Sequence, residues 1–258
     1  MNEIKLLDGN YWNVTDLKRK LIDDNFYYGE GSKLLMSNSG LSDILKSPKT
    51  FHFKQKYGSE EDDALRAGWL FHTIILEPKK FEEQIFVDVA SKNTKAYKLA
   101  KEEHGTVFTK KEKEAAERLA DAFNRNSKAV QLLNKSNFEV PTVGEIHGYP
   151  FRGKADVLTE SGRIIDLKTT TQIHNFPRSA KKWHYDVQVY IYCNLFNVDY
   201  KDFIFLALDK GSLDIGIFEV SKDFYLEGKR KTIQAIKMYE SFFIHGADLD
   251  EYTITGTL

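Results

Sequence analysis

The sequence has only one cysteine and five prolines among its 258 residues. Because Cys193 is alone, a single chain can form neither a disulfide framework nor a cysteine-ligated zinc or iron–sulfur site. Any metal ion must therefore be bound by oxygen or imidazole ligands. The few prolines, with no internal repeat and no low-complexity tract, give no indication of a long flexible linker. We expect a single domain over residues 1–258, mostly helical at 1–137 and with a sheet core at 138–258.

The sequence also has no long apolar run and no excess of one charge. No stretch approaches the ~20 consecutive apolar residues that cross a bilayer, and the first ten residues lack the apolar core of a secretory signal. These absences predict a soluble, cytoplasmic protein with no membrane contact. The formal net charge of -1 argues against a protein that coats nucleic acid through a general positive field. Any DNA contact must therefore be local.

A hydrophobic content of 41% and an aromatic content of 13% are enough to bury a substantial core. In the first half of the chain, apolar residues recur at helical spacing over 41–45, 64–76 and 109–123, and a short helix is expected at 127–133. Thr109 and Glu112 match a capping box, in which two residues exchange hydrogen bonds at the start of a helix. The first half is therefore predicted to be mostly helical.

From Phe138 the pattern changes to short apolar and β-branched runs, which is typical of strands and hairpins. Turn residues at 147–148 and 161–162 separate these runs. A helix is predicted at 181–196, a hairpin from 203–208 and 213–220, and a final helix at 222–243. This order predicts an α/β or α+β fold with a mixed central β-sheet flanked by helices.

Residues 151–170 are predicted to form two strands joined by a three-residue loop, 160–162. Gly162 falls last in this loop, where such turns require a left-handed residue. If Thr159 faces Arg163, counting back along both strands places Asp156 directly across from Asp166, with Cβ atoms ~5 Å apart. Side chains alternate between faces of a sheet, so residue 168 shares the face of residue 166, while 165 and 167 point into the core.

Two like charges that face each other across a sheet are destabilising unless a cation compensates them. Asp156, Asp166 and the nearby Lys168, without any thiolate, suit Mg²⁺ or Mn²⁺ better than zinc. The alternative is that the two acids lie at a solvated sheet edge, where Lys154 or Lys168 forms an ordinary cross-strand salt bridge. The hairpin by itself does not separate the two interpretations.

Four basic clusters could neutralise phosphates: Lys79/Lys80, Lys110/Lys111/Lys113, Arg178/Lys181/Lys182 and Lys229/Arg230/Lys231. Lysine runs on helices are more often solvated faces, and we favour that interpretation for three of the clusters. The third cluster differs, because it enters the predicted helix 181–196 near its N-terminus, where backbone amides also favour phosphate. We therefore predict that Arg178, Lys181 and Lys182 bind DNA.

The same predicted helix carries a polar stripe of His184, Gln188 and Tyr192, at positions i, i+4 and i+8. The alternative is that the stripe is simply exposed on a surface helix. A separate apolar face with residues 187, 191 and 195 is available for packing, so the polar stripe is free to face a cleft. His184 is accordingly added to the predicted DNA-binding residues.

Several motifs occur together in a fixed order: Gly153-x-x-Asp156, Asp166-Leu167-Lys168-Thr169-Thr170 and Gln188-x-x-x-Tyr192, preceded by the segments 36–42, 46–48, 64–72 and 76–78. This set resembles the RecB-like branch of the PD-(D/E)XK nuclease superfamily, and the earlier segments resemble RecE-type exonucleases of phages and prophages. The resemblance runs from about Ser37 to Tyr239. It implies a restriction-endonuclease-like core with a helical N-terminal elaboration. Ala155 stands where the motif's name has proline, a departure that is frequent in the superfamily.

The resemblance implies a metal site. His72 matches the histidine that completes this site in the RecB-like branch, and Asp156 and Asp166 match the two acidic ligands. The backbone carbonyl of Leu167 would be a further ligand. Glu145 precedes the hairpin on a neighbouring strand, where related nucleases often hold an acidic residue near the metals. An exposed strand carboxylate is an equally good interpretation of Glu145.

The resemblance also implies the chemistry. Lys168 matches the catalytic lysine, which orients or helps to deprotonate the attacking water and offsets negative charge in the transition state. Gln188 and Tyr192 match the helix that positions the substrate strand. The expected reaction is metal-assisted, in-line attack of water on a backbone phosphate of DNA, without a covalent intermediate.

By resemblance, the substrate is the end of linear double-stranded DNA, processed 5′ to 3′ to leave a 3′ single strand for an annealing partner protein. RecE-like enzymes form rings, so a homo-oligomer is expected on the same basis. Two alternatives stay open: an endonuclease that uses the same metal hairpin, and a non-catalytic DNA-binding scaffold for recombination. The intact set of His72, Asp156, Asp166 and Lys168 argues against the scaffold.

Overall fold

A computed structural model of the protein describes residues 3–58 and 62–256, so both ends of the expected domain 1–258 lie outside the described residues. The central sheet has five strands in the spatial order β5 (Ser136–Ile146), β6 (Tyr149–Thr159), β7 (Ile164–Thr170), β8 (Phe203–Asp209) and β9 (Ile215–Glu219). β7 and β8 run parallel, and the other neighbours are antiparallel. The mixed sheet confirms the predicted fold class. It is mixed because the chain passes through helices between β7 and β8.

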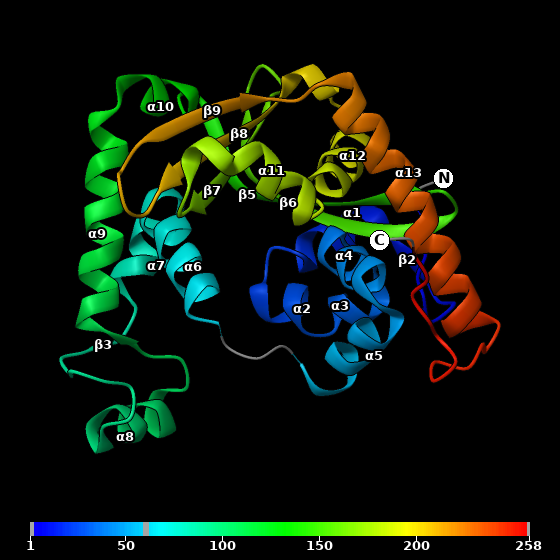
Figure 1. The fold of residues 1–258 in the computed structure, drawn as a ribbon, viewed down its shortest axis with the longest axis horizontal. Helices are drawn as coiled ribbons and strands as arrows, with labels where there is room; N and C mark the ends of the chain where they lie inside the picture. Colours follow the sequence, from blue (N-terminus) through cyan, green and yellow to red (C-terminus); the bar gives the residue numbers. More distant parts are fainter. Residues whose placement is uncertain (1–2, 59–61, 257–258) are drawn as a thin grey trace.

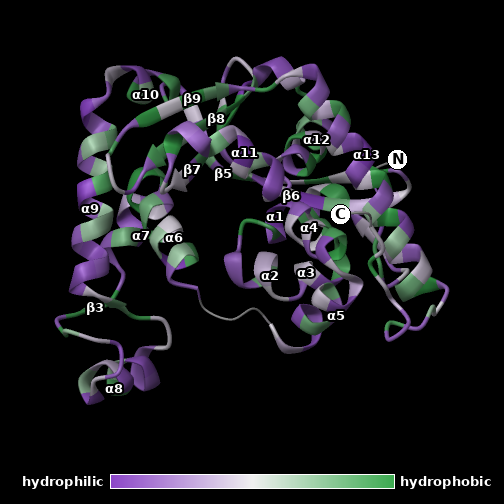
Figure 2. Ribbon diagram, viewed as in Figure 1, coloured by the Kyte–Doolittle hydropathy of each residue, from purple (hydrophilic) through white to green (hydrophobic). Residues whose placement is uncertain are grey.

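Helices cover both faces of the sheet (Figure 1). On one face, α4 (Asn38–Lys46), α12 (Tyr185–Phe196) and α13 (Lys222–Tyr239) contribute Leu41, Val187 and Ala235 to one apolar cluster. On the other face, α6 (Asp63–Leu76), α9 (Lys110–Arg125) and α10 (Ser127–Leu132) pack on the sheet through a second cluster. β8 is buried along its whole length, which agrees with its hydrophobic colouring in Figure 2.

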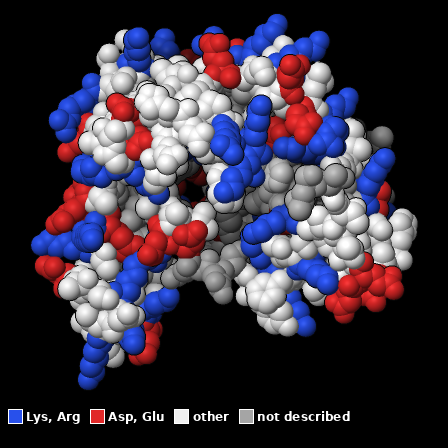
Figure 3. All heavy atoms as spheres, in the orientation of Figure 1, with Lys and Arg blue, Asp and Glu red and all other residues white. Residues whose placement is uncertain are grey.

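The remaining elements are short. They are β1 (Glu3–Lys5), β2 (Tyr11–Asn13), α1 (Val14–Lys20), α2 (Asp24–Tyr28), α3 (Gly31–Leu34), α5 (Pro48–Tyr57), α7 (Pro78–Glu82), β3 (Phe86–Val87), α8 (Lys95–His104) and β4 (Phe108–Thr109), and α13 continues as a π-helical turn, Glu240–Ile244. Helices α2–α5 and α6–α7 stand on opposite sides of a central hollow below the sheet (Figures 1 and 3). Within the described part of the chain, no helix has the length and apolarity needed to cross a membrane.

Local sequence signals for helices and turns are confirmed. The capping box at Thr109 and Glu112 is present at the start of α9. Gly162 has a φ of +84°, as the hairpin loop requires. The turn between β5 and β6 consists of His147 and Gly148, both with positive φ, which is the conformation of a two-residue type I′ hairpin.

The prediction of one helix at 181–196 is wrong in one respect, because the chain forms two helices there. The chain after β7 forms a 3₁₀ turn, Ile173–Asn175, then α11 (Phe176–Lys182), and only then α12. Between the helices, His184 has a φ of +57°, and this left-handed conformation interrupts the helix. Lys181 and Lys182 therefore lie in the last turn of α11 and not at the N-terminus of α12. The predicted support from helix amides does not apply to them.

Candidate metal centre

The hairpin of β6 and β7 opens at Asp156. The strands pair at Val157 with Ile165, and the Thr159 amide donates to the Arg163 carbonyl at 2.9 Å, so the predicted register is confirmed for residues 157–159 with 163–165. Past Val157 the regular pairing between the two strands ends, and the Asp156 carboxylate instead accepts a hydrogen bond from the Leu167 amide at 2.7 Å. The carboxylate of Asp156 thus takes the place of a backbone carbonyl as the acceptor for the Leu167 amide, at the point where the two strands separate.

Three potential ligands converge at this opening. His72 reaches it from α6, Glu139 from β5 and Asp156 from β6, and one ligand atom of each lies within 4.8 Å of the other two. The Nδ1 atom of His72 is 3.5 Å from an Asp156 carboxylate oxygen. The backbone of Leu167 also lies close to His72. A helix on one face of the sheet and two adjoining strands therefore supply a single cluster.

The electrostatics of the cluster favour a cation. Burial, and then the charge of Lys168, lowers the pKa of His72 to about 4, so its imidazole is neutral at neutral pH and its contact with Asp156 is not an ion pair. Burial raises the pKa of Asp156 to about 6. Burial and then the Asp156 charge raise the pKa of Glu139 to about 8. The cluster thus combines a neutral nitrogen donor with two carboxylates. In each carboxylate the effect of burial outweighs that of the nearby lysine charge, so the pKa is raised.

Asp166 and Lys168 form a buried pair beside this cluster. The Lys168 Nζ atom is 2.5 Å from the Asp166 Oδ2 atom, and the Gln188 amide donates to Oδ1 at 2.5 Å. Burial raises the pKa of Asp166 to about 6. Burial opposes the charge of Lys168, but the Asp166 carboxylate raises the pKa of Lys168 overall, and Lys168 stays protonated. Its Nζ atom also lies over the Tyr185 ring, 4.8 Å from the centroid.

Glu139 takes the place that Glu145 was expected to occupy. Glu145 is exposed and faces Pro150, six residues further along β5, which corresponds to about 20 Å. The structure therefore does not bring Glu145 to the cluster. Glu139 stands across from Asp156 and is not among the site residues predicted from the sequence. The two-residue turn at His147 and Gly148 fixes the register of β5 against β6 and could have located it.

The remaining predicted residues are divided between the core and the surface. Tyr192 is 5% exposed, and its hydroxyl accepts a 3.4 Å hydrogen bond from the backbone amide of Lys154. Tyr192 is therefore a buried residue that holds β6 in place. Gln188 is also buried, and it orients Asp166. His184 is half-buried at the junction of two helices. The expected polar stripe facing a cleft is thus replaced by two buried residues that hold the hairpin.

The donor set fits a divalent cation bound mainly by oxygen. Glu139 and Asp156 offer carboxylate oxygen atoms, and His72 offers one nitrogen. Beside this set, the buried Oδ2 atom of Asp166 faces the Lys168 ammonium. Oxygen-rich sites with one imidazole suit Mg²⁺ or Mn²⁺.

A family model described as a PDDEXK-like domain of unknown function (DUF3799) matches residues 37–245. The chain belongs to this PDDEXK-like family. Membership confirms the PD-(D/E)XK resemblance, and the match covers all the residues of the metal cluster. A comparison with curated proteins gave no match.

Comparison with solved structures also gives matches for this PDDEXK-like chain. A protein of Eubacterium rectale, described as a candidate exonuclease, is 16% identical with a TM-score of 0.63, over 92% of this chain and 95% of that one. At this identity the likeness shows the fold alone. A phage-related exonuclease of Haemophilus somnus 129PT is 18% identical with a TM-score of 0.36, over 82% of this chain and 96% of that one.

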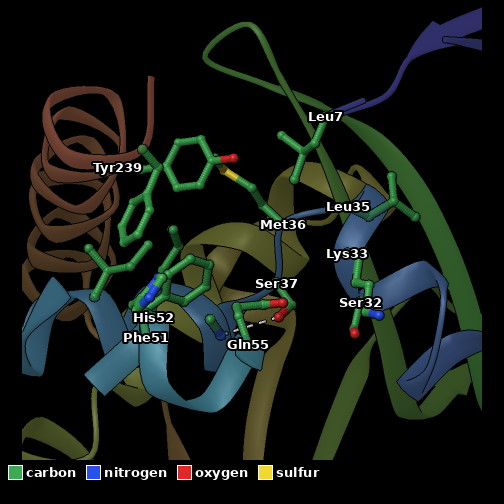
Figure 4. Close-up of a pocket in the computed structure, with 14 residues that line it drawn as sticks. Leu7, Ser32, Lys33, Leu35, Met36, Ser37, Phe51, His52, Gln55 and Tyr239 are labelled. Atoms are coloured by element: carbon green, nitrogen blue, oxygen red, sulfur yellow. Dashed lines mark hydrogen bonds between the residues drawn. The ribbon is translucent and has the colours of Figure 1, made fainter. Parts of the chain in front are cut away.

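One apolar pocket, of about 200 Å³, lies elsewhere in the molecule, where α4 and α5 meet α13. Met36, Phe51 and Tyr239 line it, with Ser37 and His52 among its few polar residues (Figure 4). None of the residues of the metal cluster lines this pocket.

Proposed function

We propose that this PDDEXK-like chain is a divalent-metal-dependent deoxyribonuclease, an exonuclease that hydrolyses the phosphodiester backbone at the ends of linear double-stranded DNA. The observation that carries the proposal is the convergence of His72, Glu139 and Asp156 beside the Asp166–Lys168 pair. A purely structural salt-bridge network would place a basic side chain beside each of these carboxylates. Here Lys168 neutralises Asp166, and Glu139 keeps a raised pKa.

The protein groups have separate parts in the proposed reaction. Glu139, Asp156, Asp166, His72 and the Leu167 carbonyl would hold Mg²⁺ or Mn²⁺. When bound, such an ion lowers the pKa of a nearby water and offsets charge on the leaving oxygen. Lys168 carries its proton on a buried amine, so it can donate a hydrogen bond to the attacking water or to a phosphate oxygen as negative charge develops.

Gln188 and Tyr192 act on the protein side of the site. The Gln188 amide fixes one oxygen of Asp166, which leaves the other oxygen directed toward Lys168. Tyr192 packs against Gly153 of β6, where an added Cβ atom would lie 3.1 Å from the ring. Together they keep the opening of the hairpin in one geometry, as the expected positioning of the substrate strand requires.

The biological setting follows the RecE-like resemblance. We propose 5′ to 3′ processing that leaves a 3′ single strand, a single-strand annealing protein as partner, and a homo-oligomer that encloses DNA, in phage-type recombination in the cytoplasm. Arg178, Lys181 and Lys182, all exposed on α11, supply the DNA contact. His184, being half-buried, has a smaller part in this contact.

The test is cleavage of end-labelled linear duplex with Mg²⁺, with Mn²⁺ and with a chelator. We expect cleavage only with metal, and its loss in Asp166→Asn and Lys168→Ala, both checked for folding by circular dichroism. Cleavage of covalently closed circles would identify the endonuclease alternative. Binding of DNA without cleavage in any metal would identify the non-catalytic scaffold.

A further inference from the structure

An exposed corner joins α11 to α12 close to Lys168. Trp183 ends α11 and is 58% exposed, His184 turns the chain with its left-handed φ, and Tyr185 begins α12. The Tyr185 ring lies under the Lys168 ammonium, at 4.8 Å. Trp183 is therefore only two residues, about 7.6 Å of backbone, from the side chain that supports Lys168.

The basic residues at this corner have no acidic partners among the residues that the structure describes. Within residues 3–58 and 62–256, no carboxylate forms an ion pair with Arg178, Lys181 or Lys182. Each of the other three basic clusters is at least partly neutralised: Lys80 pairs with Asp24 and Glu77, Lys110 with Asp88, Lys113 with Glu117, Arg230 with Glu227 and Lys231 with Asp186. Figure 3 shows Lys and Arg side chains gathered over the position of α11, at the edge of the hollow.

The corner also combines positive charge with an exposed aromatic ring. The Lys182 Nζ atom lies over the Trp183 ring, 5.0 Å from its centroid. An exposed indole beside unpaired cations is the combination with which proteins bind single strands, because unpaired bases stack on the ring while phosphates contact the cations. In the interior of a duplex both faces of every base pair are already stacked on neighbours, so away from the duplex end an indole has no free base face to contact.

We propose that this corner binds unpaired nucleotides of the strand that approaches Lys168, with Trp183 stacked on a base and Arg178, Lys181 and Lys182 on its phosphates. The inference rests on the proposed nuclease function, and it names the state of the DNA at the site. The partner class is single-stranded DNA, and neither an intact duplex nor an acidic peptide.

Tryptophan fluorescence tests the proposed binding of single-stranded DNA. A chelator in the buffer removes divalent metal ions and so prevents cleavage during the measurement. A single-stranded oligothymidylate of roughly 12 nucleotides, within the usual site size, should quench the emission of the wild-type chain, and Trp183→Phe should remove most of the quench. Trp183→Ala should weaken binding roughly 5- to 150-fold, as expected for the loss of one stacked base. Tyr11→Ala is the matched control, since Tyr11 is a similarly exposed aromatic residue, at 66% against 58% for Trp183.

Salt titration tests the charges. Lys181→Ala with Lys182→Ala should reduce the slope of log affinity against log salt by about 1.4, at roughly 0.7 per single-strand phosphate contact. Lys110→Ala with Lys113→Ala removes the same charge from paired lysines and should leave the slope unchanged.

The outcomes separate the two proposals. Wild-type affinity in Trp183→Ala, or equal binding of a blunt duplex or of polyglutamate, overturns the inference about the corner even if the protein cleaves DNA. Selective binding of the single strand through Trp183, in a protein that cleaves no DNA with any metal, overturns the nuclease proposal and supports the corner.

Discussion

Glu139 and Asp156 stand across from each other on β5 and β6, at a point where regular pairing lapses. The flanking pairs are Phe138 with Val157 and Val140 with Ala155. Glu139 itself has a φ of +50°, a left-handed conformation that costs a non-glycine residue about 1–2 kcal/mol. Backbone strain and like charge therefore coincide at one pair of residues, which is where a functional site is expected to concentrate them.

Glu139→Gln tests whether this residue is a metal ligand. The substitution keeps the size of the side chain but removes the charge, so the Mg²⁺ concentration for half-maximal cleavage should rise by about 10-fold or more. Direct binding of Mn²⁺, measured by calorimetry, should weaken in parallel.

Glu145→Gln is the control for that experiment. It makes the same change on the same strand, but at an exposed position outside the cluster. Its metal dependence should match that of the wild type. Equal metal dependence in the two variants and the wild type would remove Glu139 from the site.

Gln188→Ala tests the support of Asp166. Loss of the 2.5 Å hydrogen bond frees the Asp166 carboxylate to rotate, so the cleavage rate should fall roughly 10- to 100-fold while DNA affinity stays constant. Single-turnover kinetics with a separate binding measurement would resolve the two quantities. Asn194→Ala, on the exposed side of the same helix, should cleave normally; a similar fall there would mean that the helix as a whole had been disturbed.

Gly228→Ala tests the packing of α13 on α12. A Cβ atom at this position would lie 1.9 Å from the Asp186 carbonyl oxygen, so the helices would have to separate. The free energy of unfolding should fall by about 3 kcal/mol or more, measured by urea denaturation. Gly40→Ala, where the added Cβ meets neighbours at an ordinary 3.5 Å, should be neutral or slightly stabilising. Similar stability of the two variants would contradict the close helix contact.

Glu112→Gln tests how α6, the helix that carries His72, is anchored. Burial would raise the pKa of Glu112, but hydrogen bonds from Arg66 and from the Thr109 amide lower it to about 2. Because the unfolded chain has the higher pKa, this pair stabilises the fold fully above about pH 4.5 and loses its contribution as the pH falls toward 2. Melting temperatures between pH 2 and pH 6 should therefore depend less steeply on pH in the variant. Parallel curves would contradict the assignment.

The position of Glu139 in the site could have been located from the sequence. Once His147 and Gly148 are taken as a two-residue turn, counting back along both strands sets Glu139 opposite Asp156 and Glu145 opposite Pro150. The same counting on the next hairpin, fixed by Gly162, correctly located Thr159 opposite Arg163. Turn chemistry and the two-residue period of a strand are local properties, so they are contained in a few neighbouring residues.

The sequence by itself determined the caps, the turns, the hairpin register and the order of acidic and basic residues that indicates a PD-(D/E)XK domain. Only the tertiary structure decided that His72 reaches Asp156, that Gln188 holds Asp166 and that the chain breaks at His184 to expose Trp183. These relationships depend on how helices dock on the two faces of the sheet, for example through Asp186 with Lys231 and the close approach at Gly228. Docking is set by which side chains fill a shared core, and residues distant in the chain contribute to it together.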